Sequence, residues 1–109
     1  AAGIRLVLTT GGTGLGPRDR TPEAIVPLLD RELPGYGELL RSEGLRDTPM
    51  AVLSRSLAGN IGATLVIILP GSPRAVESGL QTLAHTIPHA LQILAGDTAH
   101  RAADKPHNG

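Results

Sequence analysis

A glycine-rich segment from Thr9 to Pro17, TTGGTGLGP, contains the residues of this sequence best suited to bind a ligand. Its glycines leave backbone N–H groups unobstructed by Cβ atoms, and Thr9, Thr10 and Thr13 add hydroxyl groups. Amides arranged in this way cradle phosphate or another anion without net charge. The segment lacks the Lys-Ser/Thr ending of a nucleotide P-loop, and proline at position 17 breaks the dinucleotide-fingerprint spacing. The alternative is a tight turn from strand to helix, but the glycines favour an anion site.

The triplet Arg18-Asp19-Arg20 follows this loop directly and carries charges of both signs. A carboxylate beside an anion site is suited to hold Mg²⁺ or to orient a nucleophile, and arginines there neutralise phosphate oxygens. The triplet also fits a solvated set of surface ion pairs, which contribute little to stability. Farther along the chain, Ser54-Arg55-Ser56 offers a hydroxyl group and a cation, although serines are also common in turns.

A second glycine turn, Pro70-Gly71-Ser72-Pro73, places a serine where a helix is expected to begin. There the hydroxyl group and the helix dipole both favour a negatively charged group, although N-capping alone also explains Ser72. His85 and His89 have the i, i+4 spacing of helical metal ligands, but a helix restart at Pro88 falls between them and disfavours a shared face. The sequence therefore predicts anion binding at the glycine turns rather than a histidine metal site.

Strands and helices alternate along the chain around these turns. The aliphatic run from Ile4 to Leu8 is typical of a strand covered on both faces. Thr21-Pro22-Glu23 predicts an N-cap at Thr21 and a helix from Pro22, with an apolar stripe reaching Leu33 and an irregularity at Pro27. The other predicted elements are helices at 37–43, at 47–53, from Pro73 and from about Thr86 to Gly96, with strands at 57–61 and 65–69 that either pair antiparallel or form one bulged segment.

This alternation predicts one α/β domain over residues 1–96, with a mostly parallel sheet, and a flexible tail without periodicity over residues 97–109. In open sheets of this kind, ligands bind beyond the carboxyl ends of the strands. The loops 9–17 and 70–73 both follow predicted strands. We therefore expect the two loops to open at the same edge of the sheet.

The composition of the chain excludes several classes of function. With 109 residues, ten basic and ten acidic side chains, and Tyr36 as its single aromatic residue, the chain lacks the basic surface and the stacking platforms of nucleic-acid-binding proteins. The absence of cysteine excludes thiolate chemistry and agrees with the reducing cytoplasm, where we expect the protein to act. The longest apolar run, 65–69, is too short for a membrane span, and because Arg5 interrupts the first apolar run, we expect that run not to be a secretory leader.

Taken together, the segments Thr9–Ala24, Leu53–Ser56 and Leu69–Pro73 resemble the MoaB/Mog family of molybdenum cofactor biosynthesis proteins. The likeness extends over residues 4–96, and the Thr-Gly-X-X-Pro-Arg-Asp motif that ends at Asp19 is its most specific part. The resemblance implies a three-layer α/β/α sandwich, a homotrimer, and transfer of AMP from Mg-ATP to the terminal phosphate of molybdopterin with release of pyrophosphate. It also implies that a first strand and helix pair, and an acidic residue used by the family, precede residue 1.

The resemblance also assigns roles to particular positions of this chain. It places the pterin and phosphate groups at the loop formed by Thr10, Gly11, Gly12, Thr13 and Gly14. It gives catalytic roles to Asp19, which is also the expected Mg²⁺ ligand, and to Ser54. Binding residues expected to complete the site are Arg18, Arg55, Pro70, Gly71 and Ser72. Two other functions stay open: a non-catalytic module that binds molybdopterin or trimerises, and a generic nucleotide-binding domain unrelated to the pterin.

Overall fold

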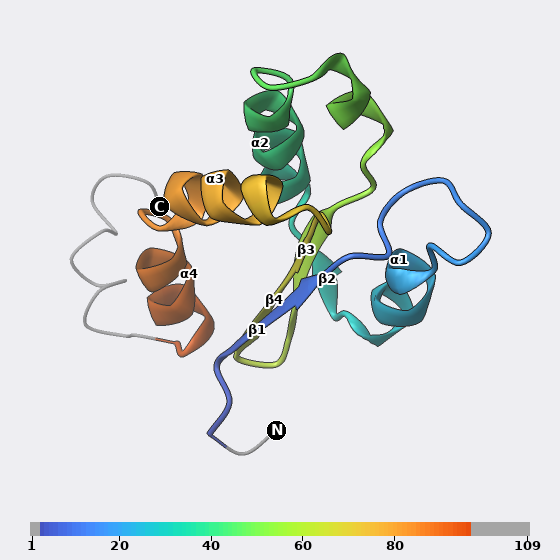
Figure 1. The fold of residues 1–109 in the computed structure, drawn as a ribbon. Coiled ribbons are helices and arrows are strands. Elements are labelled where there is room, and N and C mark those ends of the chain that lie inside the picture. The colour runs from blue at the N-terminus through green and yellow to red at the C-terminus, as the bar shows by residue number, and fades with distance from the viewer. Residues whose placement is uncertain (1–2, 97–109) are drawn as a thin grey trace.

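The computed structural model describes residues 3–96, so the predicted tail at 97–109 lies outside the described residues. In this part of the chain, four strands alternate with four α-helices and two 3₁₀ helices (Figure 1). No helix among these residues is long and apolar enough to cross a membrane. In chain order, the elements are β1 (Leu6–Thr10), α1 (Thr21–Ile25), the 3₁₀ helix η1 (Val26–Leu28), β2 (Arg31–Glu32), α2 (Pro34–Gly44), the 3₁₀ helix η2 (Pro49–Leu53), β3 (Leu57–Ile61), β4 (Thr64–Leu69), α3 (Pro73–Leu83) and α4 (Ile87–Leu94).

The strands form one sheet in the order β1-β4-β3-β2. β1 pairs in parallel with β4, with Leu6 opposite Leu65, whereas β3 pairs antiparallel with both β4 and β2. The predicted α/β class is confirmed, but the described sheet is mixed rather than mostly parallel. The cause is the short Gly62-Ala63 turn between β3 and β4, because a connection of two residues can join only antiparallel strands. Of the two sequence alternatives for this region, pairing is therefore correct.

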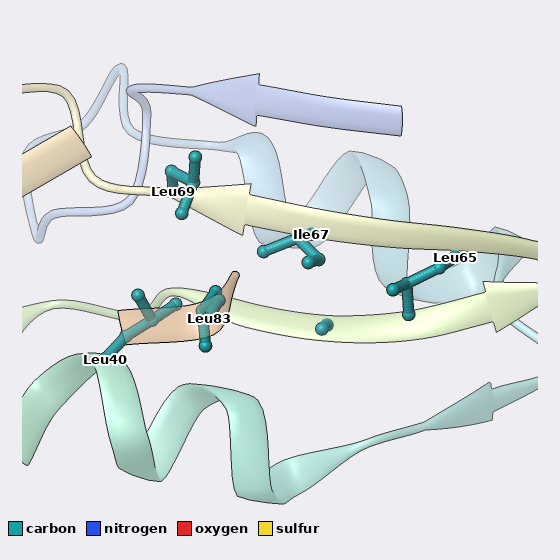
Figure 2. Packing of buried hydrophobic residues seen from close by; sticks show 6 residues of the cluster. Leu40, Leu65, Ile67, Leu69 and Leu83 are labelled. Carbon is teal, nitrogen blue, oxygen red and sulfur yellow. The ribbon is translucent and has the colours of Figure 1, made fainter. Parts of the chain in front are cut away.

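The hydrophobic core lies on one face of the sheet, between β4 and the helices α2, α3 and α4. Figure 2 shows Leu65, Ile67 and Leu69 of β4 in a row beside Leu40 of α2 and Leu83 of α3. Side chains of α4 pack against this cluster while staying partly accessible. Because successive side chains of a strand point to opposite faces, this row fixes which residues of β4 face away from the core.

The opposite face of the sheet is also covered. Leu29, just after η1, lies so close to Gly59 that a Cβ atom there would be 2.6 Å from a Leu29 methyl group. Val66 and Ile68, the β4 residues that alternate with the core row, are buried on this side. Helix α1 lies across the sheet from α2, α3 and α4 (Figure 1). Helices thus flank the sheet on both sides, in agreement with the predicted sandwich.

The segment predicted as one helix from Pro22 to Leu33 folds into three shorter elements, so that prediction is wrong. The α-helix gives way to η1, which contains Pro27, the position where an irregularity was expected. The chain then turns into β2, and the Asp30 N–H donates to the Asn60 carbonyl at 2.7 Å. Pairing with β3, a contact distant in sequence, therefore ends the helical run.

The remaining helices form close to their predicted positions. α2 begins at Pro34, earlier than expected, because proline suits the first turn of a helix. The predicted helix at 47–53 is the 3₁₀ helix η2, and Thr48 Oγ1 caps it by accepting from the Met50 N–H at 3.2 Å. At the start of α3, Ser72 Oγ accepts from the Ala75 N–H at 3.1 Å, which confirms Ser72 as an N-cap.

Candidate functional site

The parallel pairing of β1 and β4 brings the two glycine turns together, as the sequence predicts. The Gly11 N–H donates to the Leu69 carbonyl at 3.0 Å and extends the contact between the two strands beyond the end of β1. Gly11 and Gly71 then meet through their backbones, since a Cβ atom on Gly71 would lie 3.2 Å from the Gly11 Cα. The loops 11–20 and 70–72 therefore share one edge of the sheet.

Two residues, Thr21 and Arg55, hold the carbonyl oxygens of the glycine-rich loop. Thr21 Oγ1 donates to the Gly11 carbonyl at 3.0 Å, and its N–H donates to the Gly12 carbonyl at 3.0 Å. The Arg55 N–H donates to the Thr13 carbonyl at 2.8 Å, and Arg55 Nε donates to the Gly14 carbonyl at 2.9 Å. Every carbonyl group from position 11 to position 14 is thus anchored to another part of the protein.

This anchoring sets the direction of the amide groups in the same loop. In a trans peptide unit the C=O group and the following N–H group point in opposite directions. The N–H groups of residues 12–15 therefore point away from the residues that hold the carbonyls. Within residues 3–96, no group accepts a hydrogen bond from the N–H of Gly12, Thr13 or Gly14. Successive amides of this kind are the donors that an anion-binding loop requires.

Position 12 accepts only glycine, for two separate reasons. Gly12 has φ +72, a conformation that side chains other than glycine rarely adopt. A Cβ atom there would also lie 2.0 Å from Thr21 Oγ1, the atom that holds the neighbouring carbonyl of Gly11. The hydrogen bond by which Thr21 anchors the loop therefore requires glycine at position 12.

A cavity of about 460 Å³ opens beside the glycine-rich loop and is large enough for a small ligand. Leu40, Met50 and Leu53 supply apolar walls. The predicted site residues that line it are Thr13, Gly14, Ser54, Pro70 and Ser72. Those that do not line it are Thr10, Gly11, Gly12, Arg18, Asp19, Arg55 and Gly71. The structure thus brings the two glycine turns and Ser54 around one cavity.

The Asp19 carboxylate folds back over the glycine-rich loop. Asp19 Oδ2 accepts from the Gly16 N–H at 2.9 Å, and the Asp19 N–H donates to the Gly16 carbonyl at 2.9 Å. Asp19 Oδ1 accepts no hydrogen bond from the described residues. Proteins often hold Mg²⁺ by one or two carboxylates plus phosphate oxygens and water, so this residue fits the ion. Residues 3–96 contain no cluster of three or more His, Cys, Asp or Glu side chains suited to a metal.

The Arg55 guanidinium group is bonded within the protein. Besides the Gly14 carbonyl, it donates to the Asp19 carbonyl at 2.6 Å and to the Glu23 carboxylate. The hydrogen bond from Arg55 is the main cause that holds the pKa of Glu23 below its ordinary value. Arg55 therefore ties the loop to α1, and its direct contact with a phosphate stays a prediction.

The other predicted residues differ in their placement. Ser54 Oγ donates to Ser56 Oγ at 3.1 Å and accepts from the Ser56 N–H at 3.3 Å, at the wall of the cavity. Arg18 and Thr10 are exposed at the same edge of the sheet. Their roles as ligands of phosphate or pterin groups stay predictions.

Sequence reasoning missed the residues that reach this cavity from distant elements. Arg41 of α2 lines it and donates to the Ser54 and Ser56 carbonyls at 3.3 and 2.9 Å. Arg74 also lines it and pairs with Asp47 at 3.3 Å. Nothing local marks these residues, because the contacts join positions far apart in the sequence.

A second cavity, of about 760 Å³, lies between the first turn of α2 and α4. Its lining is mainly apolar and includes Leu33, Tyr36 and Ile93. None of the predicted site residues lines this cavity. The candidate functional site is therefore the smaller cavity, where the two glycine turns meet.

Comparison with known proteins places the chain among molybdenum cofactor proteins. Residues 1–89 match the family model described as a probable molybdopterin binding domain. The chain is 55% identical over 96 residues to a molybdenum cofactor biosynthesis bifunctional protein of Synechococcus elongatus, covering 88% of this chain and 30% of that protein. It is 42% identical over 92 residues to a molybdopterin adenylyltransferase of Helicobacter pylori, covering 84% of this chain and 52% of that protein. The chain thus spans about half or less of the length of these two relatives.

Solved structures show the same relationship. The molybdopterin biosynthesis Mog protein from Mycobacterium ulcerans superposes with a TM-score of 0.83 at 46% identity, covering 85% of this chain and 61% of that one. The molybdopterin biosynthesis enzyme MoaB from Thermus thermophilus gives a TM-score of 0.76 at 57% identity, covering 84% and 57%. These neighbours confirm the predicted α/β fold and the resemblance to MoaB and Mog proteins. Because the family model covers most of the sequence, the chain belongs to the family of probable molybdopterin binding domains.

Proposed function

We propose that this chain acts in molybdenum cofactor biosynthesis as an adenylyltransferase that joins the terminal phosphate of molybdopterin to AMP from Mg-ATP and releases pyrophosphate. Its family and its relatives named molybdopterin adenylyltransferase support the pathway and the pterin substrate. One observation carries the proposal. The carbonyls of the glycine-rich loop are anchored by Thr21 and Arg55, which leaves the amides of Gly12, Thr13 and Gly14 without a partner in the described residues, and Thr13 and Gly14 line a cavity.

The proposed reaction needs hydrogen-bond donors near the phosphate groups and does not need a strong general base. A phosphate oxygen of molybdopterin attacks the α-phosphorus of ATP and forms the new P–O bond, while the bond to the bridging oxygen of pyrophosphate breaks and its electron pair leaves with pyrophosphate. The attacking oxygen is already anionic, so the barrier lies in bringing two polyanions together in line. Backbone N–H groups at residues 12–14 offset that repulsion without reorganising.

Asp19 is the residue that would hold Mg²⁺, through the carboxylate oxygen that accepts no hydrogen bond from the described residues. The ion, when bound, supplies charge neutralisation at phosphate oxygens. Three further residues of this chain contribute to the proposed site. Arg55 keeps the loop in its binding conformation, Ser54 offers a hydroxyl group at the cavity wall, and Ser72 borders the cavity at the positive end of α3.

We also propose that the protein works as a homotrimer. Several large apolar side chains are exposed: Leu15 of the glycine-rich loop, Leu28 of η1, and Met50 and Val52 of η2 are 68%, 60%, 61% and 63% accessible, respectively. Exposed apolar side chains of this kind can form part of a protein interface. Sedimentation equilibrium tests this proposal, which predicts three times the mass of the chain, and a monomer at every concentration contradicts it.

Transfer of label from ATP to the pterin tests the proposed reaction. The chain is incubated with molybdopterin and Mg-ATP labelled at the α-phosphorus, and adenylyl transfer predicts labelled pterin and an equal amount of pyrophosphate. A second candidate function is binding of molybdopterin without transfer, favoured by the hydrogen bond that Asp19 Oδ2 already accepts from Gly16. It predicts pterin binding while the label stays on ATP. Binding of ATP without any pterin dependence indicates a generic nucleotide-binding domain instead.

A further inference from the structure

The segment Ser54–Ser56 connects the glycine-rich loop to helix α2, and Arg41 makes the connection on the helix side. Arg41 Nη1 donates to the Ser56 carbonyl at 2.9 Å and to the Ser54 carbonyl at 3.3 Å. Between these two carbonyls, Arg55 donates to the Thr13 carbonyl through its N–H and to the Gly14 carbonyl through Nε. Arg41 therefore holds the Ser54–Ser56 segment, and Arg55, within that segment, holds the glycine-rich loop.

The Ser54–Ser56 segment contains no apolar side chain that could pack it against α2. The preceding element, η2, contains no buried residue, and its Met50 and Val52 side chains are exposed. The only fully buried member of the segment is Ser56, whose side chain bonds to Ser54 and not to a neighbouring element. Within residues 3–96, the side-chain hydrogen bonds that α2 makes to this segment come from the Arg41 guanidinium group.

Gly37 of α2 makes room for this contact. A Cβ atom at Gly37 would lie 2.7 Å from the Ser56 carbonyl oxygen and 3.0 Å from Arg41 Nη2. Because the first of these is a backbone atom, a methyl group at position 37 must displace the segment itself. Arg41 and Gly37 thus have one function in common, which is to seat the Ser54–Ser56 segment on the helix.

We propose that Arg41 is a positioning residue for the anion-binding loop: by holding the carbonyls of Ser54 and Ser56 on α2, it fixes the point from which Arg55 anchors Thr13 and Gly14. Arg41 does not act on the reacting atoms in this role. Its effect on ligand binding passes through Arg55. The inference deepens the proposed function, because the loop that it positions is the one assigned to phosphate groups.

Hydrogen exchange of single amides tests this role without any need for catalysis. The Arg55 N–H, which donates to Thr13, reports on the contact between segment and loop, and the amides of β4 report on global unfolding. In Arg41→Met we expect the Arg55 amide to exchange about tenfold faster, because a hydrogen bond from a charged group is lost. The β4 amides should change much less. Equal acceleration at both places, or no acceleration at Arg55, overturns the proposal.

Two further variants keep the test decisive. Arg46→Met removes an exposed arginine that lies just beyond α2 and, among residues 3–96, forms its ion pair with Glu43; it should leave the Arg55 amide unchanged. Gly37→Ala displaces the segment while Arg41 remains, so it should accelerate the Arg55 amide even if Arg41→Met does not fold. An unchanged Arg55 amide in Gly37→Ala also contradicts the proposal.

Binding and turnover then separate this inference from the proposed function. Arg41→Met should weaken binding of inorganic pyrophosphate by about tenfold and raise the KM for molybdopterin more than it lowers kcat. Arg41→Lys, which retains a charged donor, should recover part of the affinity. If the unchanged chain transfers no adenylyl group while the Arg55 amide still responds to Arg41→Met, only the proposed function fails. If adenylyl transfer occurs and pyrophosphate affinity is the same in Arg41→Met, the positioning role fails.

Discussion

The backbones of Gly11 and Gly71 touch at the edge of the sheet, where a Cβ atom on Gly71 would lie 3.2 Å from the Gly11 Cα. These glycines follow β1 and β4, which run parallel, so both turns emerge on the same side. A Cβ atom at position 71 would be closer to this backbone than an ordinary van der Waals contact allows. The contact therefore sets how closely the Pro70–Ser72 turn approaches the glycine-rich loop.

Gly71→Ala should move the two turns apart by a few tenths of an ångström. We expect weaker binding of pyrophosphate and molybdopterin, with a modest loss of stability of about 1 kcal/mol, because backbone rather than a flexible side chain must give way. Isothermal titration calorimetry and urea unfolding measure the two effects. Gly35→Ala is the matched control, because a Cβ atom there meets no atom within 4 Å. If ligand affinity falls in both variants, or in neither, the close contact between Gly11 and Gly71 does not control ligand binding.

Gly12→Ala should lower the free energy of unfolding more than Gly62→Ala does, although both glycines have a positive φ. Gly62 has φ +57 with open space around it, so Gly62→Ala should cost only the left-handed conformation, about 1–2 kcal/mol. Gly12→Ala adds the collision with Thr21 Oγ1, and we expect it to cost at least about 2 kcal/mol more. Urea unfolding of both variants measures this difference. Equal costs would show that Thr21 does not hold the loop as described.

Asp19→Asn should reduce adenylyl transfer by about 100-fold or more, because the amide is a poor Mg²⁺ ligand and a preorganised charge is lost. Binding of molybdopterin should change little, since Asp19 does not line the cavity. Initial rates with labelled ATP and separate pterin titrations provide the two measurements. Asp30→Asn is the control, because Asp30 bonds to Gly62 at the β3–β4 turn. Turnover that is unchanged in Asp19→Asn removes this residue from the mechanism.

The Glu23–Arg55 pair predicts a pH dependence of stability. Because Arg55 lowers the pKa of Glu23 in the folded protein, the pair contributes stability above the ordinary glutamate pKa, and this contribution is lost as pH falls through the lowered value. Glu23→Gln should therefore be less stable than the unchanged chain at pH 7, and the difference should shrink as the pH is lowered below the ordinary glutamate pKa. Urea midpoints measured at pH 7 and along an acid series test this expectation. Glu38→Gln is the control, and a difference for Glu23→Gln that grows on acidification contradicts the sign.

Local signals in the sequence predicted many of the elements and the place of the site. Ser72 before a proline marked the start of α3, and the glycines after β1 marked the anion loop. What local signals could not show were contacts made between distant segments. The pattern Thr21-Pro22 predicts an N-cap at Thr21, but this prediction is wrong, because the Thr21 hydroxyl donates to the Gly11 carbonyl and makes no cap bond. The role of Arg55 in ligand binding stays a prediction, and its hydrogen bonds to Gly14, Asp19 and Glu23 are contacts that no local signal indicates.

The amide spectrum of the ¹⁵N-labelled chain during titration with inorganic pyrophosphate, and then with a phosphorylated pterin, reports directly on the glycine-rich loop. We expect the largest shifts at the N–H groups of Gly12, Thr13 and Gly14, because the anchored carbonyls turn these donors toward the ligand. Gly11, whose N–H bonds to Leu69, should shift less. Saturable binding that leaves the amides of Gly12, Thr13 and Gly14 unshifted would show that the loop does not hold the anion.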